Sequence, residues 1–438
     1  MAIITEQEPD QQQQHQPKQP TKTTPNQLSF CLYFTLPISL ITLYYLFTSS
    51  PQTSFLNLPT TLRHHYSNGR FIKLQTRPNQ QPINIFTFQP PPLTPTPSET
   101  VLILHGQALS SYSYRNLVHA LCTKGVRVIA VDLPGYGFSD KSLQVSADGF
   151  DGFFGRVTYV YSQIREKGFF WAFDQIVETG QIPYEEIIKR MSERKVSKPI
   201  DLGLEEIGKV FGEVIAALEL GPVHFVLHDS ALGFCANWVS ENSDLVSSLT
   251  LIDTGIHNLG AFPVWLLEVP LIREVVLGFP SVFAKVVSFC CSKRIGGLEG
   301  DANRVLLKAG DGRKAVVAIG KNLNSSFDLA EWGGSDGLKD MPMQLIWASG
   351  WSEEWSREGK RVAGALPRAK FVTHSGGRWA QEDVAIEIAE KISQFVLSLP
   401  KTVRKVKQES SIPDHIQKNL DEANSDDGHD NHHGHGRT

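Results

Sequence analysis

The chain has 438 residues, of which 41% are hydrophobic and 20% are charged, a composition typical of a protein that folds around a core. Its formal net charge of −4, with no basic stripe interleaved with aromatic residues, argues against nucleic acid as a partner. Its five cysteines form no CxxC pair, so no zinc site is predicted. We expect the adjacent Cys290 and Cys291 not to bond to each other.

The two ends of the chain differ in composition from the middle. Residues 1–27 are rich in Gln, Pro and Thr and too poor in apolar side chains to offset the entropy cost of folding, so they are predicted to be a disordered tail. Residues 400–438 become acidic and then His-rich, and are predicted to be a second disordered tail. Because these histidines have no fixed ligand spacing, a solvated tail is favoured over a loose site for a divalent metal.

A stretch near the start of the chain predicts a single membrane anchor. Residues 28–47 contain no charged side chain, and twenty helical residues span the hydrocarbon core of a bilayer. A cleaved signal peptide is less favoured, because the apolar run is long, begins late and lacks a small-x-small site after it. Lys18 and Lys22 precede the stretch and Arg63 is the next basic residue, which predicts a cytosolic N-terminus. The sequon at Asn324 would then be a glycosylation site in the lumen.

Residues 69–399 are predicted to form one α/β domain. Two alternating strands around a turn occupy residues 69–89, and short apolar runs then alternate with helical patterns. The runs are residues 101–106, 126–134, 224–229, 248–253, 343–348 and 370–374, and the helical patterns are residues 112–123, 203–219, 231–242, 355–365 and 382–398. The runs lack strict polar alternation, which is typical of strands covered on both faces. The pattern predicts a mostly parallel central sheet with helices on both faces.

Two connections in this domain are too long for simple crossovers. They are residues 141–200 and 254–340, and both contain aromatic and aliphatic clusters. Connections of that length usually have structure of their own and cover a site. We therefore predict that the two insertions build a cap over the carboxyl edge of the sheet. The competing use for so many apolar side chains is an exposed face for a partner.

Three motifs follow one another in an order that carries a family resemblance. The pair His105 and Gly106 comes after the third strand, DLPGYGFSDKS begins at Asp132, and VHFVLHDSALG surrounds Asp229. In this order the motifs resemble the α/β-hydrolase superfamily, in which the first is an oxyanion loop and the last is the nucleophile elbow. The resemblance covers approximately residues 69–399 and implies the α/β-hydrolase fold.

A narrower resemblance spans the whole chain. The segments HYSNGR, GFSDKS, VLHDSALG and NWVSEN, together with the His-rich tail, are similar to a family of plant auxin-resistance accessory proteins of the endoplasmic reticulum. This resemblance implies residence in the endoplasmic reticulum membrane and a polytopic auxin influx carrier as partner. It also implies a role in the trafficking and polar plasma-membrane localisation of that carrier, and hence in auxin response.

The elbow offers two candidate nucleophiles. A hydrolase of this fold holds its nucleophile at positive φ, with small residues two positions to either side. Ser230 has bulky residues at both of those positions, whereas Asp229 has Ala231 at one of them and aspartate tolerates positive φ. The Asp229 frame resembles the elbow of haloalkane dehalogenases and epoxide hydrolases, whose aspartate attacks carbon to form an ester. An aspartate that closes a strand and caps the next helix is an equally good interpretation.

The other positions of the family's catalytic triad are abnormal. Arg378 stands where the family has its histidine, and a guanidinium cannot accept a proton as a general base. Trp351 stands where the family has its acid, while Asp253 ends the sixth strand and reads first as a capping carboxylate. His374 is the fallback base, although a histidine satisfied at a strand end is the favoured interpretation.

These departures predict a membrane-anchored pseudoenzyme with an accessory role. No catalytic residue, cofactor or metal is expected, and His105 and Gly106 are interpreted as the remnant of an oxyanion loop. The first alternative is an active hydrolase on an ester or epoxide that uses Asp229 or Ser230 with a displaced His374. The second alternative is a non-catalytic receptor that keeps the pocket and binds a small molecule.

Overall fold

A computed structural model shows where these segments lie. It describes residues 35–39, 58–75, 81–91, 99–146, 195–255, 260–323 and 327–400. The chain divides into two compact units, residues 1–49 and 50–438. In the first unit, residues 35–39 are helical, and the rest of the predicted anchor lies outside the described residues. Within the part of the chain that the structure describes, no helix is both long and apolar enough to cross a bilayer.

Two further predictions fall outside the described residues. The predicted tails lie beyond them, apart from residue 400 at the start of the second tail. Asn324 also lies outside them, so the predicted glycosylation site stays a prediction.

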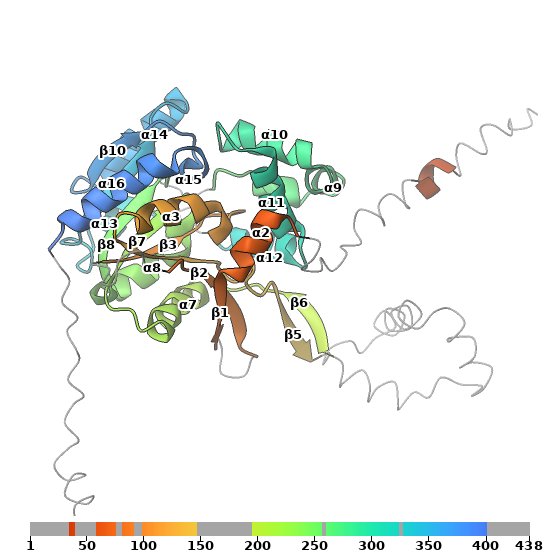
Figure 1. Cartoon of the computed structure of the whole chain (residues 1–438), viewed down its shortest axis with the longest axis horizontal. Helices are drawn as coiled ribbons and strands as arrows, with labels where there is room; N and C mark the ends of the chain where they lie inside the picture. The colour runs from red at the N-terminus through yellow and green to blue at the C-terminus, as the bar shows by residue number, and fades with distance from the viewer. Residues whose placement is uncertain are drawn as a thin grey trace, which may run out of the picture. The chain divides into compact units, whose positions relative to one another are not determined.

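The second unit is built on an eight-stranded sheet with the order β1-β2-β4-β3-β7-β8-β9-β10 (Figure 1). β2 is antiparallel to both of its neighbours, and the remaining pairs are parallel, so the predicted mostly parallel sheet is confirmed. The strands are β1 (Gly69–Leu74), β2 (Ile83–Phe88), β3 (Thr100–Leu104), β4 (Arg127–Val131), β7 (Val223–His228), β8 (Val246–Ile252), β9 (Met343–Ala348) and β10 (Lys370–His374).

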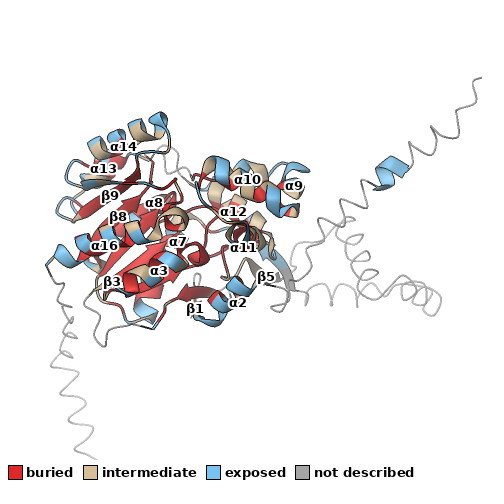
Figure 2. Ribbon diagram, turned by 45° about the horizontal axis from the view of Figure 1, so that its top comes forward, coloured by how far each residue is buried: buried red, intermediate tan, exposed pale blue. Residues whose placement is uncertain are grey.

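Helices cover both faces of the sheet, as the alternating pattern predicts. α3 and α16 share one apolar core with the sheet, while α7 and α8 pack together in the core of the other face. Figure 2 shows the central strands as buried and the outer sides of the helices as exposed. The helices that accompany the sheet are α3 (Arg115–Cys122), α7 (Leu204–Ala217), α8 (Ala231–Glu241), α14 (Glu353–Ala365), α15 (Ala380–Asp383) and α16 (Ala385–Ser398), and α2 (Thr60–Ser67) comes before β1.

The strand registers bring four strand ends close together at one edge of the sheet. His228 at the end of β7 pairs with Ile252 at the end of β8, and His374 at the end of β10 pairs with Ala348 at the end of β9. Ile252 in turn pairs with Ile346 in β9. Because parallel strands place their carboxyl ends at the same edge, the side chains that follow β7 and β8 meet those of β10 there.

The two long connections differ in what the structure describes. In residues 141–200, β5 (Ser142–Ser146) and β6 (Lys195–Pro199) form an antiparallel ribbon, and the residues between them lie outside the described part. Residues 254–340 have helices of their own, as a cap requires. These are α9 (Ile272–Gly278), α10 (Pro280–Cys290), α11 (Gly297–Lys308), α12 (Gly312–Lys321) and α13 (Leu329–Gly333), preceded by the 3-10 helix η4 (Val264–Leu267).

The expectation that Cys290 and Cys291 do not bond to each other is wrong. The two residues form a disulfide at the end of α10. Successive side chains of a continuing helix diverge by about 100°, which underlies the expectation. The helix ends here instead, because Cys291 has φ −138° and ψ −49°. Leaving the helical conformation lets neighbouring sulfurs meet. Cys122 and Cys235 are free and buried.

Candidate active site

The sharp turn between β7 and α8 is centred on Asp229. Asp229 has φ +59°, whereas Ser230 has φ −84°, so the strained position of the elbow is the aspartate. The oxyanion loop lies directly against it, since a Cβ added at Gly106 would come within 2.8 Å of Asp229 Oδ2. Only glycine fits at that position, which gives a physical reason for Gly106 in the sequence.

The two oxygens of the Asp229 carboxylate have different surroundings. Oδ1 accepts a hydrogen bond from the backbone N–H of Ala261 at 2.8 Å and faces the Arg378 guanidinium at 3.4 Å. Oδ2 is buried and has no hydrogen-bond partner among the described residues. Buried polar atoms without partners are uncommon and cluster at functional sites. One oxygen is therefore held by a backbone donor and a guanidinium, and the other is buried without a partner.

The charge state of Asp229 depends on burial and on two neighbours. Burial raises the pKa of the Asp229 carboxyl, while the Arg378 and His228 side chains oppose this rise. Burial also lowers the pKa of His228 and favours the neutral ring. Tyr114 donates its hydroxyl proton to His228 Nδ1 at 2.7 Å, and Nε2–H donates to the carbonyl of Arg378 at 2.8 Å. His228 thus holds the backbone of Arg378 and has no lone pair left for a proton.

Ser230 and His105 order the loop beside the elbow. The backbone N–H of Gln107 donates to Ser230 Oγ at 2.8 Å, so the serine hydroxyl occupies a donor of the oxyanion loop. Leu133 N–H donates to His105 Nε2, and Nδ1–H donates to the carbonyl of Gly106. Burial lowers the pKa of His105 to about 4, so the ring is neutral near pH 7. Both side chains fix the loop through hydrogen bonds.

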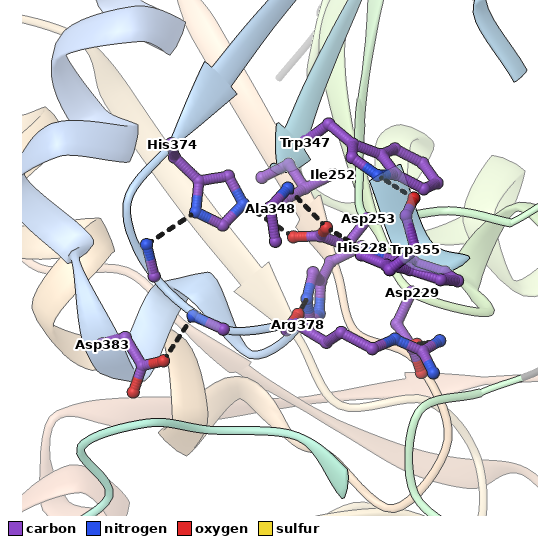
Figure 3. Close-up of polar contacts among 12 residues, drawn as sticks. His228, Asp229, Ile252, Asp253, Trp347, Ala348, Trp355, His374, Arg378 and Asp383 are labelled. Atoms are coloured by element: carbon purple, nitrogen blue, oxygen red, sulfur yellow. Dashed lines mark hydrogen bonds and ion pairs between the residues drawn. The ribbon is translucent and has the colours of Figure 1, made fainter. Parts of the chain in front are cut away.

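His374 pairs with Asp253 and not with Asp229 (Figure 3). Gly376 N–H donates to His374 Nδ1 at 3.2 Å, so Nε2 carries the proton and donates to Asp253 Oδ2 at 2.8 Å. Both side chains are fully buried. The fallback base is thus engaged in a buried pair at the strand ends. The sequence offered a signal for this pair, because Asp253 closes β8 as Asp229 closes β7.

Trp355 links this buried pair to the elbow, and the sequence analysis missed it. Its Nε1–H donates to Asp253 Oδ1 at 2.9 Å, and the Arg378 guanidinium lies 3.9 Å from the centre of its ring. Stacking on an aromatic face holds the plane of a guanidinium at a fixed distance from the ring. The Asp253 pair therefore supports Trp355, and Trp355 supports the cation that faces Asp229.

A cleft of about 780 Å³ opens beside these residues. Its lining includes Arg378, Trp355 and Gly260, together with Trp351, Arg357 and Arg361. A Cβ added at Gly260 would lie 3.1 Å from Asp229 Oδ2. A larger residue here would therefore press on the unpartnered oxygen, which is buried behind this part of the cleft wall. Trp351, at the family's acid position, is a wall of this cleft and not a triad member.

Nowhere in residues 58–400, apart from the gaps named above, do three His, Cys, Asp or Glu side chains gather in a way that could hold a metal ion. The His-rich tail lies outside the described residues.

Comparison with known proteins identifies relatives of this chain. A family model described as the alpha/beta hydrolase fold matches residues 99–367. A haloalkane dehalogenase of Psychrobacter cryohalolentis is 49% identical over 47 residues, which are 11% of this chain and 16% of that protein. Protein ABHD14A of Rattus norvegicus is 36% identical over 77 residues, which are 17% of this chain and 30% of that protein. The chain thus spans less than a third of the length of these curated relatives.

The chain also aligns with a solved structure. The crystal structure of a probable hydrolytic enzyme from Pseudomonas aeruginosa aligns with a TM-score of 0.46 and 14% identity. The alignment covers 75% of this chain and 93% of that one.

The prediction of a non-catalytic pseudoenzyme is contradicted by these findings. The family match covers most of the domain, and the relative similar over 47 residues is named as an enzyme. The elbow also retains a buried polar network, in which Tyr114 bonds His228 and Gln107 bonds Ser230 on either side of Asp229. The sequence argument took the missing histidine at Arg378 as loss of the whole site. The structure shows instead an ordered site in which a cation occupies that place.

Proposed function

We propose, from the premise that the chain belongs to the α/β-hydrolase fold family, that it is a hydrolase whose nucleophile is Asp229. The observation that carries this proposal is that the two oxygens of the Asp229 carboxylate have different surroundings. Oδ1 is held by Ala261 and faces Arg378, whereas the buried Oδ2 has no partner in the described part and lies behind Gly260 at the cleft. A positioned, partly desolvated carboxylate oxygen is a nucleophile in covalent catalysis.

In the first step, Asp229 Oδ2 forms a bond to an electrophilic carbon of the substrate. The bond from that carbon to its leaving group breaks, and the electron pair departs with the leaving group. The product is an ester between Asp229 and the substrate. The occupied oxyanion donor favours a saturated carbon, because Gln107 N–H is already bonded to Ser230 Oγ. Displacement at saturated carbon places no oxyanion on the substrate, whereas acyl transfer does. A haloalkane fits this requirement because the charge departs as halide, whereas opening an epoxide leaves an alkoxide on the product, and that alkoxide must take a proton from water.

In the second step, water adds to the carboxyl carbon of the Asp229 ester. Negative charge then develops on Oδ1, which already lies near two donors. These are the Ala261 N–H at 2.8 Å and the Arg378 guanidinium at 3.4 Å. Preorganised donors of this kind stabilise a developing oxyanion. When the intermediate collapses, the bond from the carboxyl carbon to Oδ2 breaks. The product leaves as an alcohol with one proton of the attacking water, and the other proton passes to solvent. In this proposal Arg378 replaces the family's histidine in position but acts through its charge.

The second step is proposed to be the slow one. His374 and His228 both use their two ring nitrogens in other hydrogen bonds. Without a base to take a proton from water, hydrolysis of the ester loses a factor of about 10² to 10⁴. The ester on Asp229 is therefore expected to accumulate during turnover.

Trapping this ester tests the proposal. The protein is incubated with a small panel of epoxides and haloalkanes, and intact mass followed by peptide mapping locates the added group. We expect one adduct per chain, on Asp229. Asp229→Asn should remove the adduct, and Ser230→Ala, as the matched control next to it in the elbow, should keep it. An adduct on Ser230, or none with any probe while the protein is folded, would contradict the proposal.

We also propose a cellular role in the trafficking of a polytopic auxin influx carrier at the endoplasmic reticulum membrane. The support is the resemblance of HYSNGR, GFSDKS, VLHDSALG and NWVSEN to the plant accessory family, and the anchor predicted at residues 28–47 with a cytosolic N-terminus. The cap also presents apolar side chains to solvent, including Trp265 at 58% exposure and Phe289 at 89%. Exposed apolar groups of this size suit contact with a membrane protein.

Complementation of a plant that lacks this protein tests the cellular role. The variant Trp265→Ala with Phe289→Ala should leave the carrier inside the cell, whereas the control Ile386→Ala, 77% exposed on α16, should restore its arrival at the plasma membrane. Asp229→Asn shows whether trafficking depends on the chemistry. Full rescue by the cap variant would reject the cap as the contact.

A further inference from the structure

We propose that the Cys290–Cys291 disulfide is a redox-modifiable site that controls how firmly the loop carrying Arg378 is held. The chemical partner of this site is a dithiol reductant. The structure connects the disulfide to the loop through backbone hydrogen bonds, and neither end of this connection depends on Asp229 reacting.

The first connection is direct. The carbonyl oxygen of Cys291, a member of the disulfide, accepts a hydrogen bond from the backbone N–H of Trp379 at 2.7 Å. A Cβ added at Gly377 would lie 2.9 Å from the same carbonyl oxygen. The residues on both sides of Arg378 thus pack against Cys291. The direction of one carbonyl group helps to fix the backbone from which Arg378 extends.

The second connection runs through Asp383. Its carboxylate accepts hydrogen bonds from Ser292 Oγ and from the backbone N–H groups of Lys293 and Arg294, the three residues after the disulfide. The same carboxylate accepts the N–H of Gly377 at 2.7 Å (Figure 3). One side chain therefore ties the segment after the disulfide to the start of the Arg378 loop.

In this proposal the reductant approaches the disulfide from the side of Cys290. Cys290 is half-buried, whereas Cys291 is fully buried. The free cysteines Cys122 and Cys235 are both buried, and burial raises the pKa of each thiol and disfavours the reactive thiolate. Free thiols offer a dithiol no bond to reduce, so among the described residues its expected target is the Cys290–Cys291 disulfide.

The reduction balances as a two-electron exchange. A thiolate of the dithiol attacks Cys290 Sγ, the bond between the two sulfurs breaks, and Cys291 leaves as a thiolate that takes up a proton. The second thiol of the reductant then attacks the mixed disulfide and releases Cys290. The protein gains two electrons and two protons, and the dithiol becomes a cyclic disulfide.

Opening the disulfide changes the constraint on the backbone. A disulfide between adjacent residues closes a ring of eight atoms that contains their peptide bond. While the ring is closed, the torsions between Cys290 and Cys291 are restricted, and so is the direction of the Cys291 carbonyl. Once it opens, the carbonyl can turn away from Trp379, and the Arg378 backbone loses one of its fixed neighbours.

Hydrogen exchange on the full-length protein tests this inference. Amide exchange is followed by mass spectrometry in a peptide covering residues 376–384, before and after treatment with a dithiol. Local opening governs such exchange, and we expect it to be about tenfold faster after reduction. A peptide from α16 serves as an internal control that should not change. Equal exchange in both states would overturn the inference.

Cysteine variants separate the pair from the other thiols. The Cys122→Ser with Cys235→Ser variant should keep the full response to the dithiol. The Cys290→Ser with Cys291→Ser variant should exchange like the reduced protein and ignore the dithiol. Alkylation before any reduction gives a second readout, because ready labelling of both Cys290 and Cys291 would show that the disulfide does not form. That result, or a response that persists in the second variant, would contradict the proposal even if Asp229 proves reactive.

Discussion

The Arg378 guanidinium lies 3.4 Å from Asp229 Oδ1 and 3.9 Å from the centre of the Trp355 ring. These two contacts place a permanent cation where the fold family is expected to carry a histidine that takes and gives protons. A guanidinium cannot exchange a proton near neutral pH, but it can stabilise negative charge. The site is thus arranged for a nucleophilic carboxylate and for charge on Oδ1.

The rate of adduct formation at Asp229 should decrease at low pH. This decrease, the acid limb of the pH–rate profile, should lie at a higher pH than an exposed aspartate would give. Burial raises the pKa of Asp229 above the ordinary value for aspartate, about 3.9. The folded protein therefore protonates this carboxyl at a higher pH than an exposed aspartate would. Reaction should be full well above that pKa and should fall about tenfold per pH unit below it. The rate of adduct formation across pH, with circular dichroism to confirm folding, measures this. A limb at or below pH 3.9 would contradict it.

Changing Arg378 should move that limb in a defined direction. The guanidinium favours the ionised carboxyl, so Arg378→Gln should raise the pKa of Asp229 further and shift the acid limb to higher pH. Arg378→Lys keeps the charge but loses the planar stack on Trp355, so a smaller shift is expected. If both variants keep the limb of the unchanged protein, Arg378 does not act electrostatically on Asp229.

His374→Ala should lower the free energy of unfolding but should leave the reaction at Asp229 in place. The change removes the hydrogen bond to the buried Asp253 carboxylate and leaves a cavity, at a cost of about 3 kcal/mol in the free energy of unfolding. Denaturant unfolding measures this, with the exposed His119→Ala as a control that should change little. Adduct formation at 25 °C should persist, since His374 does not touch Asp229. Complete loss of adduct in a folded variant would restore His374 as a catalytic base.

Gly106→Ala should damage the site through a steric clash. The new Cβ would lie 2.8 Å from Asp229 Oδ2, so the carboxylate or the loop must move, at a cost of about 1 to 3 kcal/mol in unfolding free energy. Adduct formation should fall at least about tenfold, because the nucleophilic oxygen is displaced or blocked. The control is Gly364→Ala on α14, where a Cβ meets nothing within 4 Å and helix propensity predicts a slight gain in stability. Equal behaviour of the two variants would count against the placement of the loop.

The strands and helices could be predicted because their signals are local. Mostly apolar runs such as residues 223–228 and 343–348 are fully buried central strands, and the amphipathic stretches between such runs are helices. The Cys290–Cys291 disulfide could not be predicted, because it depends on Cys291 leaving the helical conformation at the end of α10. Loop conformation of that kind is set by tertiary packing.

The sequence could predict which residues lie in the candidate site, but not which of them contact one another. Sequence spacing identified Asp229, Arg378 and His374 by comparison with the fold family's order of motifs. It could not show that His374 bonds Asp253, or that Trp355 carries Arg378, because these pairs are more than 20 residues apart in the chain. The expectation of an inactive protein followed from that gap, since a missing base was taken for a missing site.

Turnover in water enriched in ¹⁸O tests the central claim most directly. If Asp229 is the nucleophile, water attacks the carboxyl carbon of the ester, and one heavy oxygen remains in the protein after a single turnover. We expect that oxygen in the peptide that contains Asp229, and none in the same peptide of Asp229→Asn. Heavy oxygen found only in the product, with an unlabelled Asp229, would show that water attacks the substrate directly and would contradict the nucleophilic role of Asp229.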